Sequence, residues 1–203
     1  MKQTILWLAI FCAVLVWSAI DPYDRFTWFL EVVPALIGVF ILAITYSRFP
    51  LTPLLYSLIL LHCIILMVGG HYTYAKVPLF DDIKQWFDLA RNNYDKLGHF
   101  AQGFVPAIIV REIVIRRDII RGRGWQHVFS VAFCLAFSAF YELVEWWVAV
   151  ATGDNAQAFL GTQGYVWDTQ SDMAYALVGA IVSVMVLSRW HDKQINKISS
   201  TYA

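Results

Sequence analysis

The chain has 203 residues, of which 59% are hydrophobic, whereas soluble globular proteins are about 45–50% apolar. Its 15 basic and 15 acidic residues leave no net charge, which gives no reason to expect nucleic acid as a partner. The three cysteines lie in apolar segments without CxxC spacing, so neither a disulfide framework nor a zinc site is expected. Length and composition predict one integral membrane domain over residues 1–203.

Six apolar segments are long enough to cross a membrane as helices, since the hydrocarbon core needs about 20 helical residues and backbone groups must be satisfied within lipid. In chain order they are Thr4–Ile20, Thr27–Tyr46, Leu51–Gly69, Leu97–Ile115, Val128–Ala151 and Ser171–Leu187. The fourth segment is the least apolar, and we expect Arg111 and Glu112 to lie near the interface or to extend toward it. The predicted fold is an all-α, polytopic transmembrane bundle of six spans.

The orientation of the bundle is predicted from lysine and arginine, which are enriched in short cytoplasmic loops. With the N-terminus inside, the inner set has ten members: Lys2, Arg48, Arg111, Arg116, Arg117, Arg121, Arg123, Arg189, Lys193 and Lys197. The outer set has five: Arg25, Lys76, Lys84, Arg91 and Lys96. We therefore predict that both termini are cytoplasmic.

The first span has an alternative interpretation as a cleaved signal peptide. Lys2 precedes a short apolar core that ends near the small residues Ser18 and Ala19, a pattern that signal peptides share. Cleavage would leave five spans and would not reverse the others, and retention of the span is the preferred interpretation.

Two long loops lie on the predicted outer side, and the first of them, Gly70–Lys96, predicts a surface helix. Asp81 or Asp82 can cap a short helix over Ile83–Asn93. Its apolar face would carry Trp86, Phe87 and Ala90. Such a face is typical of a helix that lies along the membrane surface.

The second outer loop, Thr152–Gln170, contains three glycines, which indicate an irregular and tightly turning backbone. It leads into the last span, where two aspartates stand four residues apart.

Polar residues gather where the spans meet these outer loops. Three pairs have helical spacing, so that the members of each share one face of a helix: Asp95 with His99, Glu142 with Glu145, and Asp168 with Asp172. At a helical rise of about 1.5 Å per residue, all three pairs can meet in the outer leaflet. Charged residues inside a span are costly and are functional candidates by default, and Glu31 is a weaker candidate near another span end.

Each group also has a structural explanation. Asp95 and Asp168 suit the caps of helices. For Glu142 and Glu145 the alternatives are a protonated carboxyl group or a salt bridge to Lys96.

The string Asp95-Lys96-Leu97-Gly98-His99 matches the Asp-Lys-x-x-His pattern of the VanZ-like membrane proteins, and the match extends over the second half of the chain. The later acids follow in the same order, although Glu145 and Asp172 stand where that pattern more often has Gln and Asn. VanZ-like proteins are associated with glycopeptide-antibiotic resistance, so this resemblance points to lipids of the cell envelope.

Over most of its length the chain resembles the YjdF-like bacterial inner-membrane proteins, a family of unknown function. The strings that carry this resemblance are Gly69–Tyr74, Tyr94–Phe100, Tyr141–Trp147 and Trp167–Asp172. The resemblance implies a multi-pass protein of the bacterial inner membrane and brings no established activity with it.

The first functional hypothesis is a membrane-embedded enzyme or binding protein that acts on envelope lipid or lipid-linked phosphate at the outer leaflet. The candidate catalytic residues are His99, Glu142, Glu145, Asp168 and Asp172, and the candidate substrate-binding residues are Lys96, Asp95 and His71. Acids repel phosphate unless a divalent metal lies between them, so this hypothesis is most coherent with a divalent metal as cofactor, while the sequence leaves the cofactor and the identity of any metal open.

Two other functions stay open at this point. A non-catalytic envelope protein would use the polar cluster only to lock its helices together. A small proton- or ion-coupled transporter is less favoured, because six spans without a detectable repeat are not typical of transporters. The expected partner is membrane lipid, while the sequence leaves the oligomeric state and the presence of any catalytic activity open.

Overall fold

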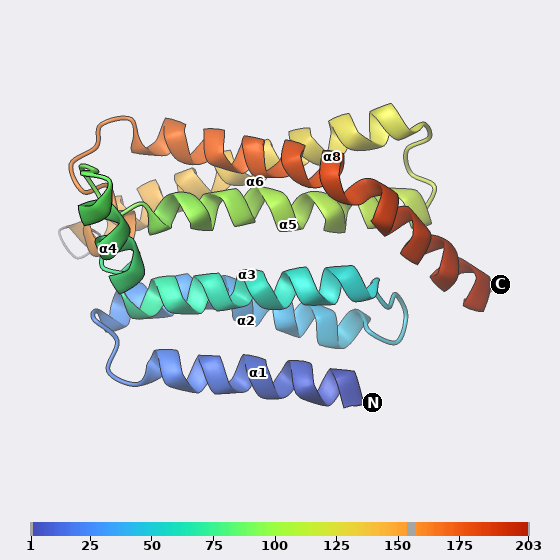
Figure 1. The fold of residues 1–203 in the computed structure, drawn as a ribbon, viewed down its shortest axis with the longest axis horizontal. Coiled ribbons are helices and arrows are strands. Elements are labelled where there is room, and N and C mark those ends of the chain that lie inside the picture. Colours follow the sequence, from blue (N-terminus) through green and yellow to red (C-terminus); the bar gives the residue numbers. More distant parts are fainter. Residues whose placement is uncertain (1, 154–156, 203) are drawn as a thin grey trace.

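The computed structural model describes residues 2–153 and 157–202, which form helices and, within these ranges, no strand (Figure 1). The long helices are α1 (Lys2–Ala19), α2 (Arg25–Thr45), α3 (Pro53–His71), α5 (Tyr94–Arg116), α6 (Arg123–Thr152) and α8 (Asp168–Tyr202). Two short helices lie in the loops, α4 (Pro78–Trp86) and α7 (Gln157–Leu160). The predicted all-α class is confirmed.

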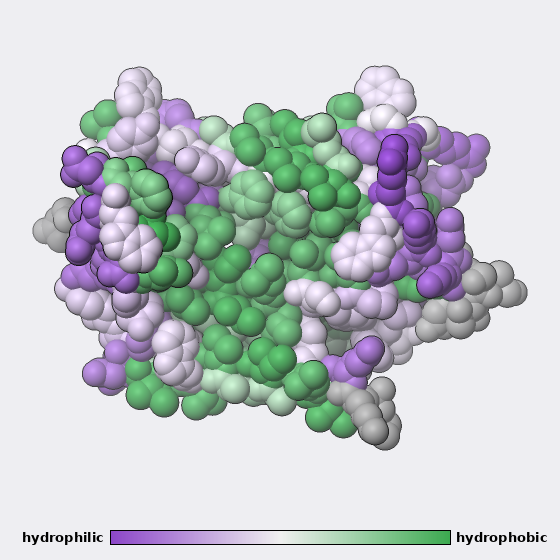
Figure 2. Space-filling view, viewed as in Figure 1, coloured by the Kyte–Doolittle hydropathy of each residue, from purple (hydrophilic) through white to green (hydrophobic). Residues whose placement is uncertain are grey.

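Five of the long helices, all except α1, are long and apolar enough to cross a membrane. The apolar part of α1, Gln3–Ala19, is shorter, but it reaches the lower end of the length range for a span and lies alongside the other helices (Figure 1). A hydrophobic belt covers the middle of the molecule, and hydrophilic residues gather at its two ends (Figure 2). The chain is therefore a polytopic helical membrane bundle.

The ends of the predicted spans agree with the helices to within a few residues, except at the last one. The sixth span was predicted to end at Leu187, whereas α8 continues to Tyr202. The apolar pattern marks where a helix leaves the hydrocarbon layer, but backbone hydrogen bonding can continue into water through residues such as Lys193 and Gln194, which favour helix.

The surface helix predicted over Ile83–Asn93 is wrong in its position. The helix is α4, which begins at Pro78, because proline suits the first helical position. It ends at Trp86. Asp88 then has a φ of 48°, in the left-handed region, so a right-handed α-helix cannot continue through it. Asp81 does not cap a helix but accepts a 2.9 Å hydrogen bond from Asn92. The expected apolar surface is nevertheless present, because Trp86 is exposed and α4 lies across one end of the bundle (Figure 1).

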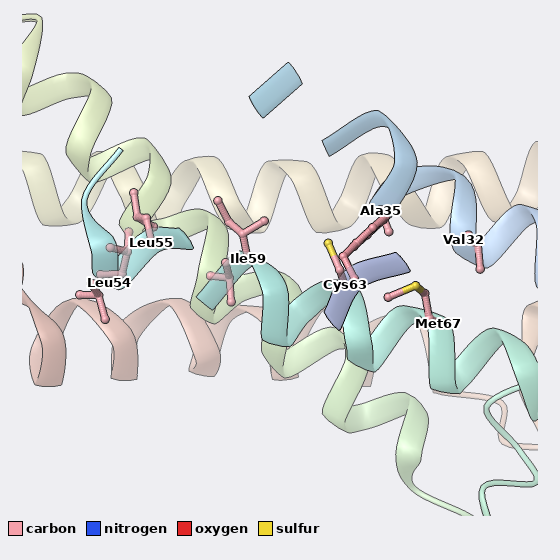
Figure 3. Packing of buried hydrophobic residues seen from close by; sticks show 10 residues of the cluster. Val32, Ala35, Leu54, Leu55, Ile59, Cys63 and Met67 are labelled. Carbon is pink, nitrogen blue, oxygen red and sulfur yellow. The ribbon is translucent and has the colours of Figure 1, made fainter. Parts of the chain in front are cut away.

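The hydrophobic core lies around α3, where that helix packs against α1, α2 and α5. Its buried side chains are Phe11, Val32, Ala35, Leu54, Leu55, Ile59, Cys63, Met67, Val105 and Ile108. Figure 3 shows the α3 members of this set from Leu54 to Met67, with Val32 and Ala35 of α2 near the part of the helix that carries Cys63 and Met67. Because α5 also packs on α6 and α8, it joins the two halves of the bundle.

Helices α5 and α8 approach each other closely at two glycines. A β-carbon on Gly103 would lie 1.8 Å from the carbonyl oxygen of Ala176, and one on Gly179 would lie 2.1 Å from that of Phe100. Small residues of this kind let two membrane helices bring their backbones together. This contact fixes how the start of α5 faces the start of α8.

The expectation that Arg111 and Glu112 extend toward the interface is wrong. Both side chains are buried in a network that joins α3, α5 and α8, the Glu112 network: Thr52, Arg111, Glu112, Arg116, His191 and Asp192. Glu112 accepts hydrogen bonds from the Thr52 hydroxyl at 2.8 Å and from Arg116 at 2.7 Å, and its Oε2 lies 2.9 Å from Nε2 of His191. Burial is possible because these partners replace water.

Both termini lie at one end of the bundle (Figure 1), here called the basic end because it also carries Arg116–Arg123. The opposite end, where α5 and α8 begin, is called the acidic end. Residues 154–156 of the loop near it lie outside the described residues.

We predict that the basic end is cytoplasmic. A reporter that is active only in the cytoplasm should be active when fused after Lys197 and inactive when inserted at Gly164. A periplasm-specific reporter at the same two positions should give the reverse pattern. Activity of the cytoplasmic reporter at Gly164 would overturn the predicted orientation.

Candidate functional site

The first turn of α5 places three of the predicted residues together. The Asn92 side chain accepts a 3.1 Å hydrogen bond from the backbone N–H of Tyr94, which fixes where the helix begins. Asp95 and His99 then share one face, with Asp95 Oδ1 3.4 Å from His99 Nε2. On the other side of the ring, His99 Nδ1 lies 3.0 Å from the side-chain oxygen of Gln102. Asp95 therefore lies inside the helix and does not act as its cap.

The first turn of α8 faces this region and is held by two cations. Lys96 Nζ donates hydrogen bonds to Asp168 at 2.7 Å and to Asp172 at 2.6 Å. Arg91 donates to Asp168 as well, and to the carbonyl oxygen of Gly161 at 3.1 Å. These ion pairs connect the start of α5 to the start of α8 and to the loop that precedes it.

His99 lies at the centre of the group. Its Nε2 is 3.8 Å from Asp172 Oδ1, and its Nδ1 is 4.0 Å from Glu142 Oε1 of α6. We call the whole group the Asp–His cluster: Arg91, Asp95, Lys96, His99, Glu142, Asp168 and Asp172. Every member is at least nine-tenths buried.

Two further acids border the cluster. Glu145 lies one turn from Glu142 on α6, is 9% exposed, and is close enough to interact electrostatically with Glu142 and His99. Glu31 of α2 is 6% exposed and interacts in the same way with Asp95 and His99. Both therefore add negative charge to the same region.

The sequence-predicted residues are thus largely brought together, with one exception. His71 at the end of α3 lies against α1: its Nδ1 is 3.1 Å from the carbonyl oxygen of Ser18, and its ring is tilted against that of Trp17, with the ring centroids 4.6 Å apart. The salt bridge considered between Lys96 and the two glutamates is also not formed, because Lys96 is closer to the aspartates.

Sequence reasoning missed Arg91 and Gln102 as members of this region. Gln102 stands three residues after His99, so the helical spacing already in use could have found it. Arg91 was placed on a surface helix, whereas it lies in an irregular segment and its guanidinium turns inward to Asp168. No spacing rule predicts that contact, because it joins residues 77 positions apart.

A metal ion is compatible with three of these residues. One ligand atom each from Asp95, His99 and Asp172 can be chosen so that all three atoms lie within 4.8 Å of one another. Carboxylate and imidazole groups together suit divalent ions such as Mn²⁺ and Zn²⁺. In addition, Glu142 Oε1 is buried beside them and has no hydrogen-bond partner.

These features define a class, a multi-pass helical membrane protein with a buried carboxylate–histidine cluster at one end. Residues 3–193 match the model of a family described as predicted membrane protein DUF2238, and the chain belongs to this family. It is 53% identical over 184 residues to the inner membrane protein YjdF of Escherichia coli strain K12, and the aligned region covers 91% of this chain and 88% of YjdF. No solved structure matches the chain.

Proposed function

We propose that the Asp–His cluster binds a divalent cation and, through it, the phosphate group of an envelope lipid or lipid-linked intermediate at the outer leaflet. In this proposal the protein is a membrane-embedded enzyme or binding protein. The observation that carries it is the excess of buried acid around a candidate three-ligand cation site.

The charges around His99 do not balance. Six carboxyl groups gather here, from Glu31, Asp95, Glu142, Glu145, Asp168 and Asp172. Within the described residues, Arg91 and Lys96 are the permanent cations that pair with this group. Buried carboxylates without counter-charge are costly, so either protons or a bound cation must supply the difference. A divalent ion between Asp95, His99 and Asp172 would supply two charges at once.

A phosphate group is the ligand that such a site favours. A bound cation would remove the repulsion between the acids and phosphate, and Lys96 and Arg91 would contribute positive charge. Helices α5 and α8 both begin here, and the N-terminal ends of helices attract anions. Because the site lies at an end of the membrane bundle, the phosphate would belong to a molecule whose apolar part stays in the lipid.

The reaction class that fits is hydrolysis or transfer at this phosphate. A divalent ion held by Asp95, His99 and Asp172 would make a water molecule nucleophilic near neutral pH, and a neighbouring carboxylate would take the proton of that water. Glu142 would be the candidate for that role, because its buried Oε1 has no hydrogen-bond partner and lies 4.0 Å from His99 Nδ1.

A non-catalytic function has one specific observation in its favour. Lys96 is held by three carboxylates and Arg91 by two, so both cations are largely used in joining α5, α8 and the loop at Gly161. A cluster with this role alone would rigidify the acidic end and would not require a metal.

Metal binding separates the two functions. Protein purified in nanodiscs, stripped with a chelator and titrated with Mn²⁺ or Zn²⁺, should bind one ion per chain. The variants Asp172→Asn and His99→Gln should weaken binding at least about tenfold, because removing even a residue that only hydrogen-bonds a metal ligand typically costs about 10–100-fold in affinity. Asp118→Asn is the matched control, because Asp118 is an exposed acid at the basic end.

All variants should first be shown to keep a wild-type elution profile. Saturable binding that survives in Asp172→Asn and His99→Gln alike would place the ion elsewhere. Absence of binding in folded wild-type protein would favour the purely structural cluster.

A further inference from the structure

A groove lies between α1 and α2 at the basic end. The two helices meet at the acidic end, where Trp28 Nε1 donates a 3.1 Å hydrogen bond to the Ser18 hydroxyl. Toward the basic end each packs on α3 and they make almost no contact with each other. The space left between them is about 660 Å³ and has α3 as its floor, a volume within the range of small-ligand sites.

The lining of the groove is mainly apolar. Leu8 of α1 and Leu42 of α2 form opposite walls, with Trp7 and Tyr56 between them. Trp7 Nε1 donates a 2.7 Å hydrogen bond to the backbone oxygen of Tyr56, so its only polar atom is already used. The Tyr56 hydroxyl accepts a 3.2 Å hydrogen bond from the backbone N–H of Leu51. The inside of the groove therefore offers an occupant hydrocarbon contacts above all.

Two arginines lie at or beside the turn between α2 and α3, at the same end of the bundle as the groove. The turn between α2 and α3 carries Arg48, two residues after the lining residue Tyr46. The guanidinium of Arg117 lies 5.1 Å from the Phe49 ring in the same turn. Neither arginine forms an ion pair with a described residue. Residues 1–20 and 32–80 contain no Asp or Glu, so none of the three lining helices brings a counter-charge here.

We propose that this groove binds an anionic phospholipid, with one acyl chain between α1 and α2 and the phosphate against Arg48 and Arg117. Basic residues beside a membrane helix attract anionic lipid headgroups, and the apolar walls supply the matching site for the chain. A second parallel copy of the protein is disfavoured as the occupant, because its own Arg48 and Arg117 would bring like charge to the same end of the bundle. The site is separate from the Asp–His cluster and does not depend on its function.

The experiment is native mass spectrometry of the full chain, exchanged into an equimolar mixture of dioleoyl phosphatidylglycerol and dioleoyl phosphatidylcholine. Wild-type protein should retain one phosphatidylglycerol at least about five times more often than phosphatidylcholine. Ala43→Trp, which fills the groove from α2, should lose this retained lipid. Ala132→Trp, the same change at an exposed position of α6, should keep it.

A second variant tests the headgroup without changing the groove. Arg48→Gln with Arg117→Gln should lower the preference for phosphatidylglycerol to near parity, and it affects only residues without ion pairs. Equal retention of both lipids by wild-type protein would overturn the proposal, and so would unchanged selectivity in the double arginine variant. A lipid-free dimer that Ala43→Trp dissociates would assign the groove to a second copy instead.

Discussion

Replacing Gly103 by alanine is expected to separate α5 from α8, to destabilise the protein strongly, and to abolish metal binding at the Asp–His cluster. The new β-carbon would lie 1.8 Å from the carbonyl oxygen of Ala176 and 2.6 Å from its carbonyl carbon. Both are backbone atoms, so no side-chain rotation relieves the overlap, and the helices must move apart by more than 1 Å. Overpacking typically costs about 1–3 kcal/mol, and we expect the clash of this β-carbon with the backbone of Ala176 to cost an amount at or above the top of that range.

The Asp–His cluster should lose its metal binding when the two helices separate, because its side chains come from both α5 and α8. Lys96 and His99 of α5 reach Asp172 of α8 over 2.6 Å and 3.8 Å. A shift of an ångström or more between the helices would break the first contact and remove Asp172 from the set of candidate ligands.

The measurements are the melting temperature in detergent and the Mn²⁺ affinity of the protein that remains folded. Gly38→Ala is the matched control: Gly38 is also inside a membrane helix, but a β-carbon there meets no atom within 4 Å. Alanine favours helix over glycine by about 1 kcal/mol, so this control should melt at or slightly above the wild-type temperature. Equal melting temperatures for the two variants would show that α5 and α8 are not in backbone contact.

The sequence predicts the spans well because lipid leaves so few options. A long apolar segment must hydrogen-bond its own backbone, and hence its length alone marks a helix. The ends of the helices are harder to predict, since outside the hydrocarbon layer local backbone conformation and helix propensity determine where a helix begins and ends. At α4 a proline and a left-handed Asp88 fix the bounds, whereas at α8 the helix continues for a further fifteen residues past the apolar segment, from Leu187 to Tyr202.

The candidate site was predictable in part, for a similar reason. Helical spacing shows that Asp95 and His99 share a face, because that relation is local. Spacing cannot show which residue of another helix lies opposite, and so it did not predict that Lys96 pairs with Asp168 and Asp172. The inward position of Arg91 and the separation of His71 also depend on tertiary packing. The VanZ-like pattern stays a prediction.

The Glu112 network shows most clearly what the spacing of residues in the sequence cannot predict. Judged from its own helix, a charged residue at position 112 should extend to water. The structure instead supplies partners from α8 and from the start of α3, and both oxygens of Glu112 accept hydrogen bonds. The sequence contains these partners, but they stand 60 and 79 positions away.

Removing this carboxylate is the second change with a large expected effect. Glu112→Ala should destabilise the protein by about 3–5 kcal/mol, as breaking a buried ion pair by removing one partner does. It would leave Arg116 without its carboxylate, and the buried Thr52 hydroxyl and N–H without an acceptor. Urea or thermal unfolding in a fixed detergent would measure the loss. Asp118→Asn is the control: it removes the charge of an exposed acid paired with Arg121 at the same end of the bundle, and asparagine tolerates the φ of 48° at this position, so stability should change little.

Glu112→Gln tests whether stability depends on the negative charge of this side chain or only on its shape. Arg111 Nη1 can only donate, so His191 Nδ1, 3.0 Å away, must accept and Nε2 must carry the proton. That proton points at Glu112 Oε2, 2.9 Å away. An amide can present one oxygen only. If that oxygen faces Arg116 and the Thr52 N–H, the NH₂ group opposes the His191 N–H, and the reverse placement turns the NH₂ group toward the Arg116 guanidinium. Glu112→Gln should therefore also be destabilising, though less than Glu112→Ala. Wild-type stability in both variants would mean that the side chain reaches water after all.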